Sequence, residues 1–212
     1  MRDARPRIAV LLSGSGTSLE NLLEQIEAGA VPGSVCVVVA SKPNAFGLER
    51  ARRRGIPAIA VPRKEHPGAR EFNDAIHAAL APHEPDLVLL LGFLSPFETR
   101  GRYDGRTLNL HPALIPAFCG KGFYGHRVHE AVLAAGVRVT GATVHFVDAE
   151  YDQGPIVLQE SVPVQGDDTP ETLAARVQAL ERRLVPEAVR LFAAGRLALD
   201  GRRVRILSAR PD

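Results

Sequence analysis

Short apolar runs alternate with amphipathic stretches along the first half of the chain. Four of the runs are bounded mostly by Gly, Pro or charged residues, which is typical of buried strands. They lie at residues 8–12, 35–40, 58–61 and 87–91. Helical spacing of apolar positions predicts helices between them, at residues 19–28, 46–54 and 71–81. Strands that alternate with helices predict a parallel sheet with right-handed crossovers.

The pattern changes in the second half of the chain. A short strand at residues 108–110 and a helix at 126–135 come first. Two extended runs, 140–147 and 155–164, then follow with a polar turn between them, so they are predicted to pair. We therefore expect an α/β fold with a mostly parallel central sheet, helices on both faces, and antiparallel strands toward the carboxyl terminus.

Local signals define the last elements. Thr169, Pro170 and Glu171 suit the N-cap and first turn of a helix that is predicted to run to about residue 194. Residues 197–204 then predict a hairpin with Asp200-Gly201 at its turn. We see no internal repeat or linker, so a single domain over residues 1–212 is the simplest expectation.

Composition narrows the function classes. The chain has 212 residues, 45% of them hydrophobic, and a formal net charge of +2, so little charge draws it to nucleic acid. No basic run is interleaved with aromatic residues, and no apolar run is long enough to span a membrane. Two cysteines and no signal peptide favour a cytoplasmic protein. We expect Cys36 to fill the core and Cys119 to be an incidental thiol.

A loop rich in Gly and Ser follows the first predicted strand. Residues 13–18 read SGSGTS and open the first helix, where small residues and free N–H groups favour an anion. A nucleoside-triphosphate loop would end in Gly-Lys-Ser/Thr, and Leu19 occupies the third glycine position of a dinucleotide fingerprint. A phosphate monoester therefore fits better. The alternative is a tight turn capped by Ser18 with no ligand.

Candidate chemistry lies in two later segments. Asn109 could donate a hydrogen bond to an oxyanion, His111 could donate another or carry a proton, and Asp152 could keep His111 charged. His145 could orient water or Asp152, or could be a satisfied core histidine. Each residue taken alone also has an ordinary structural interpretation. Together they suit acyl transfer to an amine without a metal or a covalent nucleophile.

Other catalytic classes fit poorly. No G-x-S-x-G elbow supports a serine hydrolase. His126 and His129 are spaced i, i+3, but no H-E-x-x-H motif or cysteine pair accompanies them, so we expect no metal.

Five segments of the chain resemble the phosphoribosylglycinamide formyltransferases of the folate-dependent formyltransferase family. They are SGSGTSL at 13–19, AFGLERA at 45–51, LNLHPALIP at 108–116, GATVHFV at 141–147 and DQGPI at 152–156. The resemblance extends from about Arg7 to Arg205 and implies a Rossmann-like formyltransferase fold. It also implies formyl transfer from 10-formyltetrahydrofolate to 5-phosphoribosylglycinamide, the third step of de novo purine (IMP) biosynthesis. No metal is implied, and a homodimer is possible.

The resemblance also assigns expected roles to individual residues. Asn109, His111 and Asp152 match the catalytic trio. The expected substrate contacts are Gly16, Thr17, Ser18, Gln178 and Glu181. The expected folate contacts are Arg70, Phe93, Leu94 and Asn109. The phosphate-binding half would span about residues 1–100, and the folate and catalytic half about 101–212.

The chain departs from the family pattern in places. Ser18 stands where Asn is usual, and Cys119 stands where Pro is commoner. After Phe93, Leu94 leads straight into Ser95-Pro96, so the segment that normally lines the pterin pocket is shorter.

Three other functions remain open from the residues. A 10-formyltetrahydrofolate hydrolase would share the trio, but such relatives usually carry an amino-terminal regulatory domain, and only a few residues precede Ile8. A methionyl-tRNA formylating enzyme would need a carboxy-terminal RNA-binding domain. A non-catalytic module that binds a phosphate ligand would leave the trio unexplained.

Overall fold

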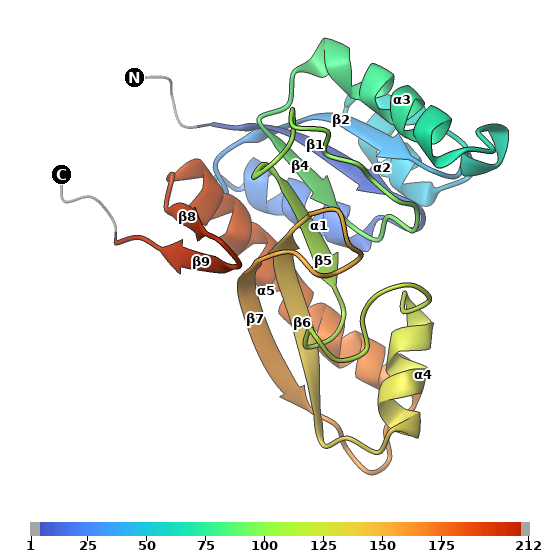
Figure 1. Cartoon of the computed structure of the whole chain (residues 1–212), viewed down its shortest axis with the longest axis vertical. Helices are drawn as coiled ribbons and strands as arrows, with labels where there is room; N and C mark the ends of the chain where they lie inside the picture. Colours follow the sequence, from blue (N-terminus) through green and yellow to red (C-terminus); the bar gives the residue numbers. More distant parts are fainter. Residues whose placement is uncertain (1–4, 209–212) are drawn as a thin grey trace. The chain divides into compact units, whose positions relative to one another are not determined.

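The computed structural model describes residues 5–208, and the chain divides into two compact units, Met1–Leu108 and Asn109–Asp212. Within the described residues, the main sheet has seven strands, and a separate two-stranded sheet lies near the carboxyl terminus. Figure 1 shows the helices and strands of both units. The expected α/β fold, mostly parallel with antiparallel strands toward the carboxyl terminus, is confirmed.

The amino-terminal unit alternates strands and helices as predicted. Its elements are β1 (Arg7–Leu12), α1 (Thr17–Glu27), β2 (Ser34–Ala40), α2 (Phe46–Arg53), β3 (Ala58–Ala60), η1 (Arg63–Glu65), α3 (Ala69–Leu80), η2 (Ala81–His83) and β4 (Leu87–Leu90). The two short 3-10 helices, η1 and η2, were not predicted. The other boundaries fall within about two residues of the predicted ones.

Strand order explains where this unit places a ligand. The strands are parallel in the order β3-β2-β1-β4, with β1 paired to both β2 and β4. Every residue of β1 after Arg7 is fully buried, because this strand lies inside the sheet. The order reverses at β1, so right-handed crossovers place α1 and α2 on one face and α3 on the other. The carboxyl ends of β1 and β4 therefore form the switch point at which α/β sheets bind ligands.

The carboxy-terminal unit is built around an antiparallel pair. The elements from the unit boundary onward are β5 (Thr107–His111), α4 (His126–Ala134), β6 (Val139–Phe146), β7 (Ile156–Pro163), α5 (Pro170–Ala193), β8 (Leu197–Asp200) and β9 (Arg203–Ile206). β6 and β7 pair in antiparallel register, as predicted. α5 packs against both of these strands and against α4 (Figure 1).

Capping fixes the start of α5. The Thr169 hydroxyl accepts a hydrogen bond from the N–H of Thr172, and the Thr172 hydroxyl accepts one from the N–H of Thr169. This reciprocal pair is a capping box, and Pro170 takes the first helical position as predicted.

The turn of the last hairpin lies one residue later in the chain than predicted. Asp200 pairs with Arg203, so the two central residues of the turn are Gly201 and Arg202 rather than Asp200 and Gly201. Gly201 has a φ of 58°, which places the glycine at the first central position, as in a type II′ turn.

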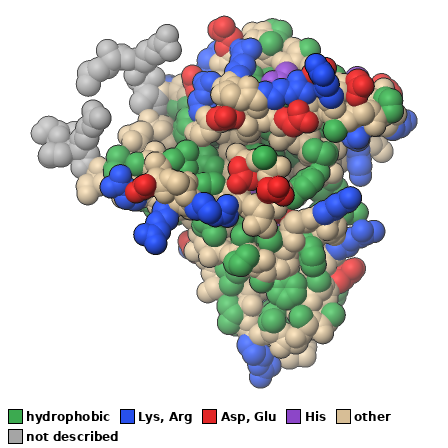
Figure 2. Space-filling model, in the orientation of Figure 1, with side chains coloured by type: hydrophobic (Ala, Val, Ile, Leu, Met, Phe, Trp, Pro, Cys, Tyr) green, Lys and Arg blue, Asp and Glu red, His purple; other side chains and the backbone are tan. Residues whose placement is uncertain are grey.

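Surface charge agrees with the small net charge. Over the amino-terminal unit, Figure 2 shows Lys and Arg side chains interspersed with Asp and Glu rather than gathered by sign. No helix within residues 5–208 combines the length and the apolar character needed to cross a bilayer.

Candidate active site

A tight turn joins β1 to α1 at the predicted anion site. α1 begins at Thr17 with Gly16 as its N-cap, and no side chain caps the helix. Gly16 has a φ of 71°, in the left-handed region that glycine adopts without strain. Ser18 lies inside the first helical turn, so the alternative of a turn capped by Ser18 is wrong. The geometry at the start of α1 instead favours an anion.

Buried Ser13 fixes the base of this loop. Its N–H donates to the Gly92 carbonyl at 3.0 Å, and its hydroxyl lies 2.6 Å from the Ser41 hydroxyl. The Ser13 hydroxyl also accepts a hydrogen bond from the N–H of Leu94 at 2.9 Å. Since Gly92 and Leu94 follow β4, these contacts hold the loop at the switch point between β1 and β4.

The underside of the loop packs against the start of α2. The N–H of Gly47 donates to the Gly14 carbonyl at 3.1 Å. A Cβ added at Gly16 would lie 2.8 Å from the Gly47 Cα, closer than real Cβ atoms approach. The close approach and the positive φ both require glycine at position 16.

His111 ends β5 and is buried, with 4% of its side chain exposed. Its Nε2 lies 2.8 Å from the Phe118 carbonyl, so Nε2 carries a hydrogen and donates it. Its Nδ1 lies 3.5 Å from Oδ2 of Asp152. Burial lowers the pKa of His111, and the Asp152 charge and the Phe118 hydrogen bond offset only part of this effect. The expectation that Asp152 keeps His111 protonated near neutral pH is therefore wrong.

Asp152 lies in the loop between β6 and β7 and has a φ of 54°, which is uncommon for a residue other than glycine. Its Oδ2 accepts a hydrogen bond from the N–H of Gly120 at 2.8 Å. Burial by itself would raise the pKa of Asp152, but the neighbouring rings of His145 and His111 and the Gly120 N–H together lower it. Asp152 is therefore ionised at neutral pH.

Asn109 links Asp152 to His145. The Asn109 Nδ2 lies 3.1 Å from Oδ1 of Asp152 and 3.1 Å from Nε2 of His145. Nδ1 of His145 lies 2.8 Å from the Phe146 carbonyl and donates to it, which leaves Nε2 as an acceptor. Both amide hydrogens of Asn109 are thus used within one partly buried cluster that also contains His111.

Sequence reasoning missed two members of this cluster. Phe118 and Gly120 contribute a backbone carbonyl and a backbone N–H to His111 and Asp152. Both residues have a positive φ, 51° for Phe118 and 89° for Gly120. The glycines of this loop were the one available signal, because they mark a backbone with unusual turns.

Gln178 and Glu181 lie one turn apart on α5, as predicted. Burial raises the pKa of Glu181 to about 7, so this carboxyl changes its charge near neutral pH. Three of the four folate contacts expected from the resemblance, Arg70, Phe93 and Leu94, lie in the amino-terminal unit, whereas Asn109 begins the carboxy-terminal unit. Phe93 stacks on Phe72 with ring centroids 6.2 Å apart, and the Leu94 side chain is 46% exposed.

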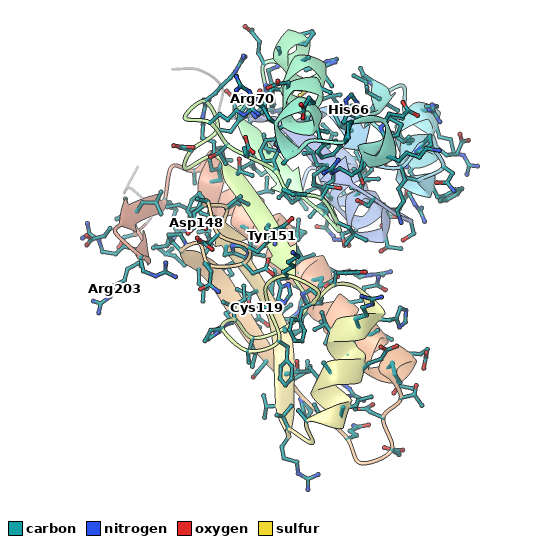
Figure 3. All side chains as sticks on the ribbon, turned by 45° about the vertical axis from the view of Figure 1, so that its right-hand side comes forward. His66, Arg70, Cys119, Asp148, Tyr151 and Arg203 are labelled. Carbon is teal, nitrogen blue, oxygen red and sulfur yellow. The ribbon has the colours of Figure 1, made fainter. Side chains whose placement is uncertain are left out.

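Arg70 is the second residue of α3 and is exposed (Figure 3). Its carbonyl accepts a hydrogen bond from Arg100 at 3.2 Å, so the backbone at this position is held by a second basic residue. The placement suits an arginine that binds an anionic group from solvent.

The cysteines play no visible part in the chemistry. Cys119 lies in the loop after β5 (Figure 3), and burial together with the Asp152 charge raises the pKa of its thiol. A thiol with a raised pKa is a poor nucleophile at neutral pH. Within residues 5–208, no group of three His, Cys, Asp or Glu residues is arranged to hold a metal ion.

Comparison with known proteins places the fold and the site in context. Residues 6–189 match the family described as Formyl transferase. The phosphoribosylglycinamide formyltransferase of Mycobacterium tuberculosis is 44% identical over 212 residues, which cover 96% of this chain and 95% of that protein. The crystal structure of glycinamide ribonucleotide transformylase 1 from Symbiobacterium toebii matches with a TM-score of 0.91 and 44% identity, covering 98% of this chain and 96% of that one.

The chain also matches part of a longer protein. The trifunctional purine biosynthetic protein adenosine-3 of Gallus gallus is 40% identical over 193 residues. These residues cover 89% of this chain but only 18% of that protein.

Proposed function

The chain belongs to the formyl transferase family, and from this premise we propose that it transfers the formyl group of 10-formyltetrahydrofolate to the amine of 5-phosphoribosylglycinamide. The products are N-formyl-phosphoribosylglycinamide and tetrahydrofolate, in the third step of de novo purine biosynthesis. The names of relatives that this chain matches over nearly their whole length support the choice of acceptor.

The observation that carries the proposal is the partly buried cluster of Asn109, His111 and Asp152. It offers two hydrogen-bond donors and one carboxylate, the set required for stabilising an oxyanion and moving a proton. The uncapped start of α1 supports the same proposal, because it suits the acceptor's phosphate. We propose Gly16, Thr17 and Ser18 as the phosphate contacts, and Gln178 and Glu181 as further acceptor contacts.

The proposed reaction joins the acceptor nitrogen to the formyl carbon and breaks the bond from that carbon to N10 of the folate. The neutral amine attacks, and negative charge develops on the formyl oxygen. The Asn109 amide and the Nε2–H of His111 donate to this oxygen. These new hydrogen bonds replace the ones that the two side chains make within the free protein. A neutral imidazole is sufficient here, because Nε2 carries a hydrogen in the neutral form. A proton lost by the amine reaches N10, and we propose a water beside Asp152 as its carrier.

For the folate, we propose contacts from Arg70, Phe93, Leu94 and Asn109. His145 supports the cluster by accepting from Asn109. One domain comprising both units, a cytoplasmic location and a possible homodimer remain predictions.

An assay of acceptor dependence tests the proposal. Deformylation of 10-formyltetrahydrofolate is followed by absorbance, with and without phosphoribosylglycinamide. Turnover only with the acceptor is expected. Turnover without it would identify a hydrolase instead, and binding of the acceptor without any turnover would identify a binding module.

Glu181→Gln should change how stability depends on pH. The folded-state pKa of about 7 lies above the ordinary value of 4.5, so folding favours the protonated carboxyl. The wild-type protein should therefore lose about 1–3 kcal/mol of unfolding free energy, relative to the variant, as pH rises from about 4.5 to above 7. Urea unfolding of both proteins at several pH values measures the difference. Parallel pH profiles would contradict the raised pKa.

A further inference from the structure

We propose that Arg50 is a positioning residue for the phosphate loop, residues 13–18, and that it turns the N–H groups of this loop toward the phosphate of the acceptor. This inference rests on the proposed function, because the phosphate in question is that of the proposed acceptor.

Arg50 lies on α2 and is held from three sides. Its Nε donates to the Ser15 carbonyl at 2.9 Å, and its Nη1 donates to Oε2 of Glu20 at 2.8 Å. Its guanidinium also lies 4.9 Å from the centre of the Phe46 ring. A planar guanidinium that is held at several points has little conformational freedom, so it can hold the Ser15 carbonyl in one orientation.

Two consecutive carbonyls of the loop point toward α2. The Gly14 carbonyl accepts from the N–H of Gly47 at 3.1 Å, and the Ser15 carbonyl accepts from Arg50. In a trans peptide, the C=O and the following N–H point in opposite directions. The N–H groups of Ser15 and Gly16 must therefore point away from α2.

These two N–H groups lie immediately before the first turn of α1, which has no side-chain cap. Successive backbone N–H groups that converge beside a helix start form a concave site for an anion. By binding the carbonyls of Gly14 and Ser15, Gly47 and Arg50 thus determine the direction in which the loop N–H groups point. Gly47 acts through its backbone, so Arg50 is the side chain through which the orientation can be tested.

Arg54 provides a matched control on the same helix face. Its Nη2 donates to Oε1 of Glu20 at 2.6 Å and its Nε donates to Oε1 of Glu27 at 2.7 Å. The two arginines share Glu20 and are equally exposed, at 24%. Loss of Arg54 removes a salt bridge to α1 but leaves the hydrogen bond from Arg50 to Ser15. The pair therefore separates loop orientation from general helix packing.

The experiment compares Arg50→Met with Arg54→Met in steady-state kinetics. Arg50→Met should raise KM for phosphoribosylglycinamide about 10- to 100-fold, the cost of a charged hydrogen bond, and change kcat less than about threefold. KM for the folate should stay unchanged. Arg54→Met should leave the KM for phosphoribosylglycinamide, the KM for the folate and kcat at their wild-type values. With the acceptor nucleoside that lacks the phosphate, Arg50→Met and the wild type should have equal kcat/KM. An unchanged acceptor KM in Arg50→Met, or an equal loss with the phosphate-free acceptor, would overturn the inference.

Binding of ribose 5-phosphate, measured by calorimetry, separates this inference from the proposed reaction. Weaker binding by Arg50→Met alone would support the role of Arg50 even if the wild type transferred no formyl group. Equal binding by wild type and Arg50→Met would overturn it even if formyl transfer were established. Arg50→Lys keeps the charge without the planar guanidinium, and it should retain most of the loss in ribose 5-phosphate binding. Full recovery by lysine would show that the planar guanidinium is not required and would overturn the positioning role assigned to it.

Discussion

Asn109→Ala should lower kcat about 10²- to 10³-fold, the usual cost of removing one donor to an oxyanion. In the free protein, Asp152 and His145 hold both hydrogens of the Asn109 amide, so the amide is oriented before substrate arrives. A donor that is already oriented loses little energy through reorganisation during the reaction. Single-turnover rates with saturating substrates measure the effect directly. Binding of ribose 5-phosphate should remain at the wild-type level.

Loss of stability needs its own control, because Asn109→Ala also removes a donor from buried His145 and partly buried Asp152, at a cost of about 1–3 kcal/mol. Asn73→Ala is the matched variant. Asn73 is fully buried in α3, where its amide donates to the Ala69 carbonyl and accepts from the N–H of Glu98. This variant should be similarly destabilised but keep the wild-type kcat. Equal turnover by the two variants would remove Asn109 from the mechanism.

Asp152→Asn should lower kcat about 10²- to 10⁴-fold, the range expected when a proton-handling group is lost. The two carboxylate oxygens accept from Asn109 and Gly120, and an amide can accept through only one of its two positions. The NH2 group of the introduced asparagine would then face either the Asn109 amide or the Gly120 N–H, which are both donors. The negative charge that partly offsets the effect of burial on His111 would also disappear, so the pKa of His111 should fall further. Titration of the His111 ring by NMR, together with kcat, tests both effects.

Asp148→Asn provides the control for that substitution. Asp148 lies in the same loop and is exposed, and its carboxylate accepts from the N–H of Glu150 at 3.0 Å (Figure 3). The variant carries the same change of charge outside the cluster of Asn109, His111 and Asp152, so kcat and the His111 titration should both match the wild type. If Asp152→Asn and Asp148→Asn gave the same His111 titration, the proposed coupling between Asp152 and His111 would be refuted.

Much of the architecture was predictable because it depends on patterns that are local in the sequence. Apolar runs marked β1 and β4, and the Gly-Ser turn after β1 marked the start of α1. The juxtaposition of Asn109 and Asp152 was also predictable, since Asn109 lies near the carboxyl end of a strand and Asp152 occupies a nearby hairpin loop.

Other features depend on groups that carry no side-chain signature. The carbonyl of Phe118 and the N–H of Gly120 would be present whatever residue stood there, so no motif could assign them to His111 and Asp152. The pKa of His111 reflects competition between burial and a nearby charge, and only the folded structure shows which effect is larger. Arg50 lies within a segment of the family resemblance, but its contact with Ser15 joins residues 35 positions apart.

The left-handed backbone of Asp152 limits which substitutions mutational drift can place there. Among the residues other than glycine, aspartate and asparagine tolerate a φ near 54° best, because their short polar side chains can bond locally. Glutamate would keep the charge, yet it suits this backbone less and places its oxygens one methylene farther out. Asparagine keeps the backbone but loses the charge. A substitution table that ranks Asp and Glu as near equivalents would therefore misjudge this position. Glutamate preserves only the charge, and asparagine preserves only the backbone conformation.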